Sequence, residues 1–133
     1  MSADPKRIFI VDDEASFTRL LKAALENAGS YRVEYSNHAT QALAAARAFQ
    51  PDVVLLDVIM PDGSGAELAT QFKADEHLKA APIIFLTAAV PKHAAAREGT
   101  LAGYPCLAKP ITLEALIACL ERQLGTESQK PSA

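Results

Sequence analysis

The sequence predicts an α/β protein in which a five-stranded parallel sheet, with strand order 2-1-3-4-5, is flanked by five helices in a doubly wound sandwich. Two observations predict this fold class. Short apolar runs alternate five times with segments that carry apolar residues at helical spacing. Most of the runs are continuously apolar, which is typical of strands buried on both faces of a parallel sheet. Right-handed crossovers between such strands then favour the stated order.

Each element has a local signal in the chain. The five strands are expected at Ile8–Val11, Tyr31–Tyr35, Val53–Leu56, Ile83–Thr87 and Tyr104–Ala108. The second of these has mixed polarity, so we expect it at an edge of the sheet. The turn after the third strand is predicted by Met60-Pro61-Asp62-Gly63, because proline lacks a backbone donor and Asp-Gly favours a turn.

The helices are expected between the strands. The first carries inward-facing apolar residues and ends at Gly29; the set is Phe17, Leu20, Leu21, Ala24 and Leu25. The second spans Ala39–Ala48, and Ser64 caps a third that runs to about Ala74. A fourth, from Pro91 to about Ala102, has mostly alanine on its apolar face and should be the least firmly anchored. Thr112 caps the last, with a core stripe of Leu113, Leu116, Ile117, Leu120 and Leu124.

Composition fits one globular domain. Of the 133 residues, 50% are hydrophobic and 22% charged, so the chain can bury a core of its own. We expect a polar lead-in at residues 1–6, a folded domain at 7–124, and a disordered tail or linker at 125–133. The two cysteines, Cys106 and Cys119, are too few for a disulfide framework or a zinc site and are expected to be reduced core thiols.

Charge and hydropathy narrow the function classes. The net charge is -3 and the pI about 5.6, which gives no electrostatic reason to expect nucleic acid or an anionic membrane as partner. No segment approaches the ~20 apolar residues of a membrane span, and the N-terminus lacks a signal-peptide core. We therefore expect a cytoplasmic protein.

Polar residues end four of the predicted strands. Asp12 and Asp13 follow the first strand, and the others are Asp57, Thr87 and Lys109. Any one of them could be a capping or surface residue, but the carboxyl ends of parallel strands share one edge, where α/β sheets bind ligands. A flavin carrier of this architecture would need a phosphate loop after the first strand, where these acids would repel phosphate. A metal-dependent phosphohydrolase would need a further acid near Asp57, which the next residues do not offer.

These motifs together resemble the receiver domain of two-component response regulators. The resemblance runs from Arg7 to about Leu124 and is carried by Val11–Glu14, Leu56–Gly63, Leu86–Ala88 and Ala108–Ile111. It implies a flavodoxin-like fold and a role for each matching residue. Asp57 would be the phosphoacceptor, Thr87 the switch hydroxyl and Lys109 the phosphate-contacting lysine. The metal ligands would be Asp12, Asp13, Asp57 and the backbone carbonyl of Ile59. The Lys109–Pro110 peptide bond is expected to be cis.

Elementary electrostatics agrees with these roles. Three carboxylates at one edge repel one another, and at ~5 Å with an effective dielectric near 20 each pair costs on the order of 3 kcal/mol before screening. A divalent cation would remove that cost, and an all-oxygen ligand set favours Mg²⁺. The site would accept a phosphoryl group on Asp57 from a histidine kinase or a histidine phosphotransfer protein, and signal to a downstream protein target. Such a protein is no enzyme in the ordinary sense, because it catalyses only its own phosphorylation and dephosphorylation.

Two features of the sequence depart from the family pattern. Receiver domains usually carry an aromatic residue three positions before the lysine, where this chain has Cys106. The nearest aromatic, Tyr104, could serve as a displaced reporter ring on the same face of the strand, but we expect a stabilising surface tyrosine. Ile59 and Ala89 are apolar where polar side chains often tune hydrolysis, so we expect slow loss of phosphate. Switching is therefore expected in the loop after Thr87 and in the following helix. The missing aromatic leaves one alternative open, a receiver-like scaffold that works without phosphorylation.

Overall fold

The computed structural model describes residues 5–61, 63–87, 99–101 and 103–125. Its strands are β1 Lys6–Val11, β2 Tyr31–Ser36, β3 Val53–Asp57, β4 Ile59–Met60, β5 Gly63–Ser64, β6 Ile83–Thr87, β7 Gly99–Leu101 and β8 Tyr104–Ala108. Its helices are α1 Ala15–Ala28, α2 Ala39–Phe49, α3 Gly65–Ala74 and α4 Leu113–Leu120, which continues into a π-helical segment, Glu121–Gly125.

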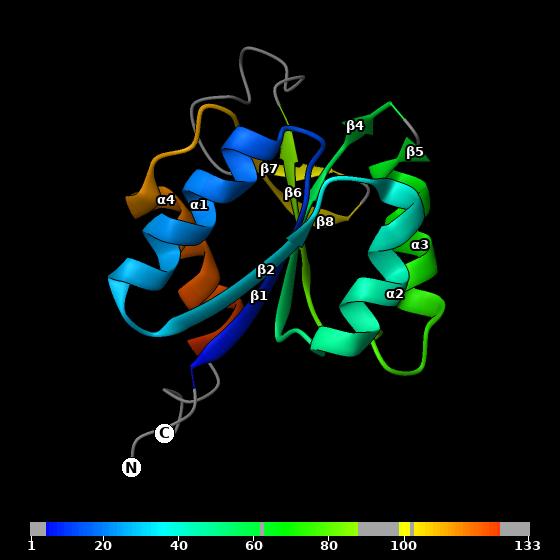
Figure 1. Ribbon diagram of the computed structural model, residues 1–133, viewed down its shortest axis with the longest axis horizontal. Helices are drawn as coiled ribbons and strands as arrows, with labels where there is room; N and C mark the ends of the chain where they lie inside the picture. Colours follow the sequence, from blue (N-terminus) through cyan, green and yellow to red (C-terminus); the bar gives the residue numbers. More distant parts are fainter. Residues whose placement is uncertain (1–4, 62, 88–98, 102, 126–133) are drawn as a thin grey trace.

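The main sheet has six strands in the order β2-β1-β3-β6-β8-β7. The first five are parallel and reproduce the predicted order 2-1-3-4-5. Helices α1 and α4 cover one face of the sheet, and α2 and α3 cover the other (Figure 1). The doubly wound sandwich expected from the sequence is therefore confirmed.

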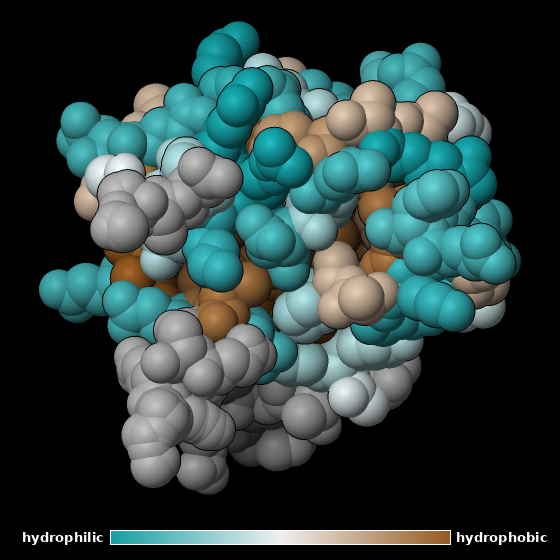
Figure 2. Space-filling view, turned by 90° about the horizontal axis from the view of Figure 1, so that it is seen from below, coloured by the Kyte–Doolittle hydropathy of each residue, from teal (hydrophilic) through white to brown (hydrophobic). Residues whose placement is uncertain are grey.

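Two hydrophobic cores lie between the sheet and its helix layers. On the α2–α3 side, Phe9 and Phe85 of the sheet belong to one buried cluster with Phe72 of α3. On the α1–α4 side, Leu25 and Leu116 belong to a second cluster with Leu55 of the sheet. All residues of β3 and β6 are buried, as expected for central strands. The face in Figure 2 is largely hydrophilic, and hydrophobic residues come into view mainly in hollows between polar ones.

Helix ends follow the predicted capping residues. The Ser64 side chain accepts hydrogen bonds from the backbone N–H groups of Ala66 and Glu67, at 3.1 and 3.3 Å. The Thr112 hydroxyl accepts one from Ala115 at 3.1 Å. Gly29 follows α1 with a φ of 115°, a backbone conformation that glycine adopts without strain. These caps fix where the helices begin and end.

The predicted helix from Pro91 to Ala102 is wrong at its C-terminal end. Residues Gly99–Leu101 form strand β7, which pairs antiparallel with β8 at the sheet edge. Gly103, with a φ of 87°, makes the turn between these strands, and this turn outweighs the helical preference of the preceding alanines. Residues 91–98 of the predicted helix lie outside the described part of the chain.

Two leucines that were expected to face the core are exposed. Leu20 is 70% exposed, because the inner face of α1 is set by Thr18, Leu21 and Leu25. Leu113 is 37% exposed in the first turn of α4, whereas Leu116 lies fully inside. Both departures leave apolar side chains at the surface of the α1–α4 layer.

Two side chains of α1 form hydrogen bonds with the backbone of the edge strand β2. The Lys22 ammonium donates to the backbone carbonyl of Val33 in β2 at 2.9 Å. The backbone N–H of the same residue donates to the Glu26 carboxylate, also at 2.9 Å. At Val33 the backbone of the edge strand is therefore bonded by side chains of α1 on the side that faces away from β1.

Other expectations concern the membrane and the thiols. No helix in the described ranges is both long enough and apolar enough to span a bilayer. Cys106 and Cys119 are buried and form no disulfide, as predicted.

Candidate functional site

Strand register brings the predicted site residues to the carboxyl edge of the sheet. Val11 pairs with Leu56, so the next residues, Asp12 and Asp57, end neighbouring strands. Asp57 in turn pairs with Leu86 of β6. Thr87, the last residue of β6, pairs with Ala108, and Lys109 follows directly. Parallel pairing is therefore sufficient to gather residues that lie 97 positions apart.

Three carboxylates lie together at this edge. Asp12, Asp13 and Asp57 each present an oxygen atom within 4.8 Å of the others. Asp12 is fully buried, Asp57 is 6% exposed, and Asp13 is exposed. Burial and the charges of Asp12 and Asp13 raise the pKa of Asp57 from 3.8 to about 6, although Lys109 and the backbone N–H of Ile59 act in the opposite direction. The cluster holds more negative charge than its surroundings neutralise.

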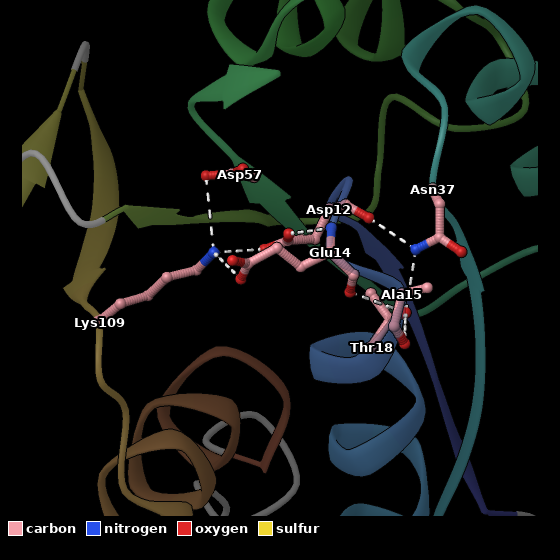
Figure 3. A network of polar contacts seen from close by, with 7 residues as sticks. All are labelled: Asp12, Glu14, Ala15, Thr18, Asn37, Asp57 and Lys109. Carbon is pink, nitrogen blue, oxygen red and sulfur yellow. Dashed lines mark hydrogen bonds and ion pairs between the residues drawn. The ribbon is translucent and has the colours of Figure 1, made fainter. Parts of the chain in front are cut away.

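The Lys109 ammonium is the cation nearest to these acids among the described residues. Its Nζ lies 2.6 Å from Asp12 Oδ2 and 4.0 Å from Asp57 Oδ1 (Figure 3). It also lies 3.7 Å from the Glu14 carboxylate, a contact that the sequence did not predict. Burial tends to lower the pKa of Lys109, but the hydrogen bond that its ammonium donates to Asp12 and the charges of the surrounding carboxylates outweigh it and raise the pKa. The lysine is therefore held in its charged form.

The acids after β1 are held by backbone and side-chain hydrogen bonds. The Asp12 N–H donates to the carbonyl of Ser36, and Asp12 Oδ1 accepts from the N–H of Glu14 at 3.0 Å. Asn37 Nδ2 donates to the Asp12 carbonyl at 2.7 Å and to the Thr18 hydroxyl at 3.0 Å. Sequence reasoning missed Asn37 and Thr18. The available signal was position, since Asn37 follows the second strand at the same edge of the sheet.

The segment after Asp57 depends on a glycine. The Gly65 N–H donates to the carbonyl of Val58 at 2.8 Å, which places α3 against the end of β3. A Cβ atom on Gly65 would lie 2.2 Å from the Asp57 carbonyl oxygen. Between these points Ile59 exposes 65% of its surface and pairs with Ser64 in the β4–β5 hairpin. The close approach holds the N-terminus of α3 against the backbone of Asp57 at the carboxyl end of β3.

The chemistry of these donors fits a hard divalent cation. The carboxylate oxygens of Asp12, Asp13 and Asp57 lie close enough to share one ion, and no nitrogen or sulfur ligand is part of the described cluster. Small, hard cations such as Mg²⁺ prefer one or two carboxylates with the remaining positions left to water or phosphate. The excess negative charge that raises the pKa of Asp57 is what such an ion would neutralise.

Comparison with known families decides the class of this site. Residues 8–121 match the model of the response regulator receiver domain. The chain belongs to this receiver domain family. Over 123 residues it is 31% identical to the polar-differentiation response regulator DivK of Brucella anthropi, covering 91% of this chain and 98% of that protein. It is also 46% identical over 83 residues to the phosphate regulon transcriptional regulatory protein PhoB of Pseudomonas aeruginosa, covering 62% of this chain and 36% of that protein.

Solved receiver domains share the fold. The chemotaxis protein CheY4 of Vibrio cholerae superimposes with a TM-score of 0.77 at 29% identity, covering 90% of this chain and 99% of that one. The receiver domain of sensor histidine kinase PA1611 from Pseudomonas aeruginosa has a TM-score of 0.77 at 28% identity, covering 91% and 98%. That structure has a magnesium ion coordinated in its active-site cleft. The receiver domain described here is thus a phosphorylation-based signalling module by family.

The first departure from the family pattern lies in β8. Cys106, which stands at the usual aromatic position, is buried and pairs with Phe85 of β6. Tyr104, predicted to be a surface residue, is half-buried, and its ring meets the Phe85 ring edge-on with centroids 5.5 Å apart. The Lys109–Pro110 bond is cis, as the resemblance implied. Ala89 and the predicted switch loop lie outside the described residues.

Proposed function

We propose that this receiver domain accepts a phosphoryl group on Asp57 from a histidine kinase or a histidine phosphotransfer protein, in the presence of Mg²⁺. One observation carries the proposal, the gathering of three carboxylates within 4.8 Å with the Lys109 ammonium 4.0 Å from Asp57. A buried carboxylate beside two further acids and only one cation carries negative charge that its surroundings do not neutralise. A bound divalent cation would neutralise this charge and allow the site to accept a phosphoryl group.

Each residue has a part in the transfer. With a pKa of about 6, Asp57 is mostly ionised at neutral pH, and one of its oxygens attacks the phosphorus of the donor phosphoimidazole. The new bond joins that oxygen to phosphorus, the N–P bond breaks, and the imidazole leaves with its electron pair and takes up a proton. Lys109 contacts a phosphoryl oxygen, and Thr87 at the end of β6 donates its hydroxyl to another.

The metal would be held by the same edge of the sheet. Asp12, Asp13 and Asp57 would supply carboxylate oxygens, which lie within 4.8 Å of one another. The backbone carbonyl of Ile59 would supply a fourth protein ligand, as the family resemblance implies. Bound Mg²⁺ supplies positive charge that offsets the charge on the acids and on the transferred oxygens. These assignments support a switch that acts only on its own phosphorylation state, within the cytoplasm, and passes the signal to a protein target.

An apolar groove beside the site is suited to a protein donor. It has a volume of about 590 Å³ and runs between α1 and the segment that leads into α4. The exposed Leu20 and Leu113 line it, together with Glu14 and Lys109, whose charged groups meet at the acidic site. A partner seated here would bury apolar surface and bring its phosphohistidine to the edge where Asp57 lies.

Phosphorylation of the purified chain tests the proposal directly. Incubation with acetyl phosphate and Mg²⁺, followed by intact mass measurement, should show the gain of one phosphoryl group. The gain should be absent in Asp57→Asn and when EDTA replaces Mg²⁺. A wild-type chain whose mass does not change under these conditions would overturn the proposal.

A second candidate function has one observation in its favour. Cys106 and the half-buried Tyr104 replace the usual aromatic arrangement of β8, which favours altered signalling or a scaffold that works without phosphorylation. The same mass measurement separates the two functions. A scaffold predicts no phosphoryl gain and partner binding that is equal in wild type and Asp57→Asn.

A further inference from the structure

A chain of hydrogen bonds ties the loop after β2 to the acids that follow β1 (Figure 3). Asn37 provides both links through one nitrogen, which donates to the Asp12 carbonyl at 2.7 Å and to Thr18 Oγ1 at 3.0 Å. A carbonyl oxygen can only accept, so the amide nitrogen must face Asp12. The loop after β2, the end of β1 and the first turn of α1 are thereby joined through a single side chain.

Thr18 makes this link rigid from the helix side. It is fully buried, and its hydroxyl lies 3.1 Å from the Ala15 carbonyl, to which it donates. With that hydrogen committed, the hydroxyl oxygen is left to accept from Asn37. Helix α1 begins after Glu14, which provides no side-chain cap. The Asn37–Thr18 hydrogen bond therefore connects the first turn of α1 to the loop after β2.

The link acts on the peptide that joins the two metal-binding acids. The Asp12 carbonyl belongs to the peptide unit that leads into Asp13, and its orientation sets the direction in which the Asp13 side chain leaves the backbone. The Asp12 carboxylate is itself held by Glu14 and Lys109. The Asp13 carboxylate is exposed, and the course of the backbone after Asp12 brings it within 4.8 Å of the carboxylate oxygens of Asp12 and Asp57.

We propose that Asn37 and Thr18 are positioning residues that set the affinity of the acidic site for Mg²⁺ by fixing the peptide between Asp12 and Asp13. The proposal rests on the Mg²⁺-dependent function proposed above. Neither side chain touches the ion. Outer partners of this kind orient metal ligands, and their loss commonly weakens metal binding by about tenfold or more.

Mg²⁺ affinity, rather than activity, is the quantity to measure. The variants are Asn37→Ala and Thr18→Val, the second of which keeps the shape of threonine but loses the hydroxyl. Thr18→Ser restores the hydroxyl, and Asn27→Ala, at an exposed asparagine of α1, is the matched control. Titration of amide chemical shifts with Mg²⁺ gives the dissociation constant, and thermal unfolding in EDTA reports stability without metal.

We expect Asn37→Ala and Thr18→Val each to weaken Mg²⁺ binding about tenfold, with Thr18→Ser and Asn27→Ala within about twofold of wild type. The double variant should bind no more weakly than either single variant, because both remove the same link. Should Thr18→Val fail to fold, the half-buried Asn37 still carries the test. Asn37→Ala that melts earlier but binds Mg²⁺ like wild type would overturn the proposal, as would unchanged affinity in both single variants.

The outcome is separable from that of the proposed function. A wild type that is phosphorylated on Asp57, with variants of unchanged Mg²⁺ affinity, contradicts the positioning role alone. A wild type that binds Mg²⁺ but takes up no phosphoryl group contradicts the proposed function alone, provided that the variants bind more weakly. A wild type that binds no Mg²⁺ overturns the positioning role as well.

Discussion

At the scale of single residues, Asp57 is a group whose ionisation works against folding. Its pKa is about 6 in the folded protein, compared with an ordinary value of 3.8, chiefly because of burial and the nearby charge of Asp12. Between these two values the folded chain holds the proton more tightly than the unfolded chain does. The stability contributed by the protonated form is therefore complete below pH 3.8 and is lost as the pH rises through about 6.

Because the pKa of Asp57 is raised in the folded protein, removal of its charge should stabilise the fold at neutral pH. In metal-free buffer, Asp57→Asn should raise the free energy of unfolding at pH 7.5 by about 1–2 kcal/mol, since it removes a buried charge. It should also flatten the increase in stability that the wild type shows between pH 7.5 and pH 5. Urea unfolding in EDTA at several pH values measures both effects. A variant less stable than wild type at pH 7.5 would contradict this account.

Lys109, in contrast to Asp57, is expected to stabilise the fold through its charge, because it forms an ion pair with the fully buried Asp12. Lys109→Met keeps much of the side-chain volume but leaves Asp12 without its ion pair, which should cost about 3 kcal/mol in EDTA. Mg²⁺ should raise the melting temperature of this variant more than that of wild type, because the ion takes over the lost charge. Thermal unfolding with and without Mg²⁺ measures the difference. Equal Mg²⁺ effects on the two proteins would show that the lysine does not stand in for metal.

At the scale of secondary-structure elements, the position of α3 is set by contact with the backbone. Gly65→Ala would bring a Cβ atom to 2.2 Å from the Asp57 carbonyl oxygen, which cannot yield without moving β3. We expect a loss of about 3 kcal/mol or more, measured by urea unfolding. Gly63→Ala is the matched control, because its Cβ would meet only the Ala39 side chain, at 3.0 Å. Similar stability of both variants would contradict the close packing.

Elements whose limits are set by neighbouring residues could be predicted from the sequence, whereas elements set by distant contacts could not. Ser64 and Thr112 cap their helices through contacts with residues two or three positions away, and both caps were predicted. The end of the alanine-rich segment was not, because a turn at Gly103 and pairing with β8 decide it. Leu20 shows the same limit, since helical spacing alone does not say how far the apolar face extends.

The same distinction applies to the residues of the candidate site. Asp12, Asp57, Thr87 and Lys109 could be predicted to meet, because parallel strands deliver their carboxyl ends to one edge whatever the loops do. Asn37 and Thr18 could not, because their role depends on hydrogen bonds across a loop whose path the sequence does not specify.

At the scale of the whole molecule, the α1–α4 groove is the surface through which we expect a phosphoryl donor to approach. Leu20 is 70% exposed, so Leu20→Glu should change the free energy of unfolding by no more than about 0.5 kcal/mol. Phosphorylation by acetyl phosphate should proceed at the wild-type rate, because that donor needs no groove. Transfer from a histidine kinase that phosphorylates the wild type should slow by about tenfold.

The control for this prediction lies on the other face of the sheet. Ala44 is exposed on α2, and Ala44→Glu introduces the same charge far from the groove. It should leave both transfer rates unchanged. A Leu20→Glu protein that receives phosphate from the kinase as fast as wild type would assign the donor to a different surface.

The hydrogen bonds from Lys22 and Glu26 to Val33 bear on how copies of this protein meet in a crowded solution. An unpaired strand edge is a template on which another chain can add a strand, and such addition leads to aggregation. At Val33 the outward N–H and carbonyl already have partners on α1, and the two side chains place opposite charges along that edge. Addition of a foreign strand at this point would first have to break both contacts. These two contacts thereby protect this point of the β2 edge against strand addition.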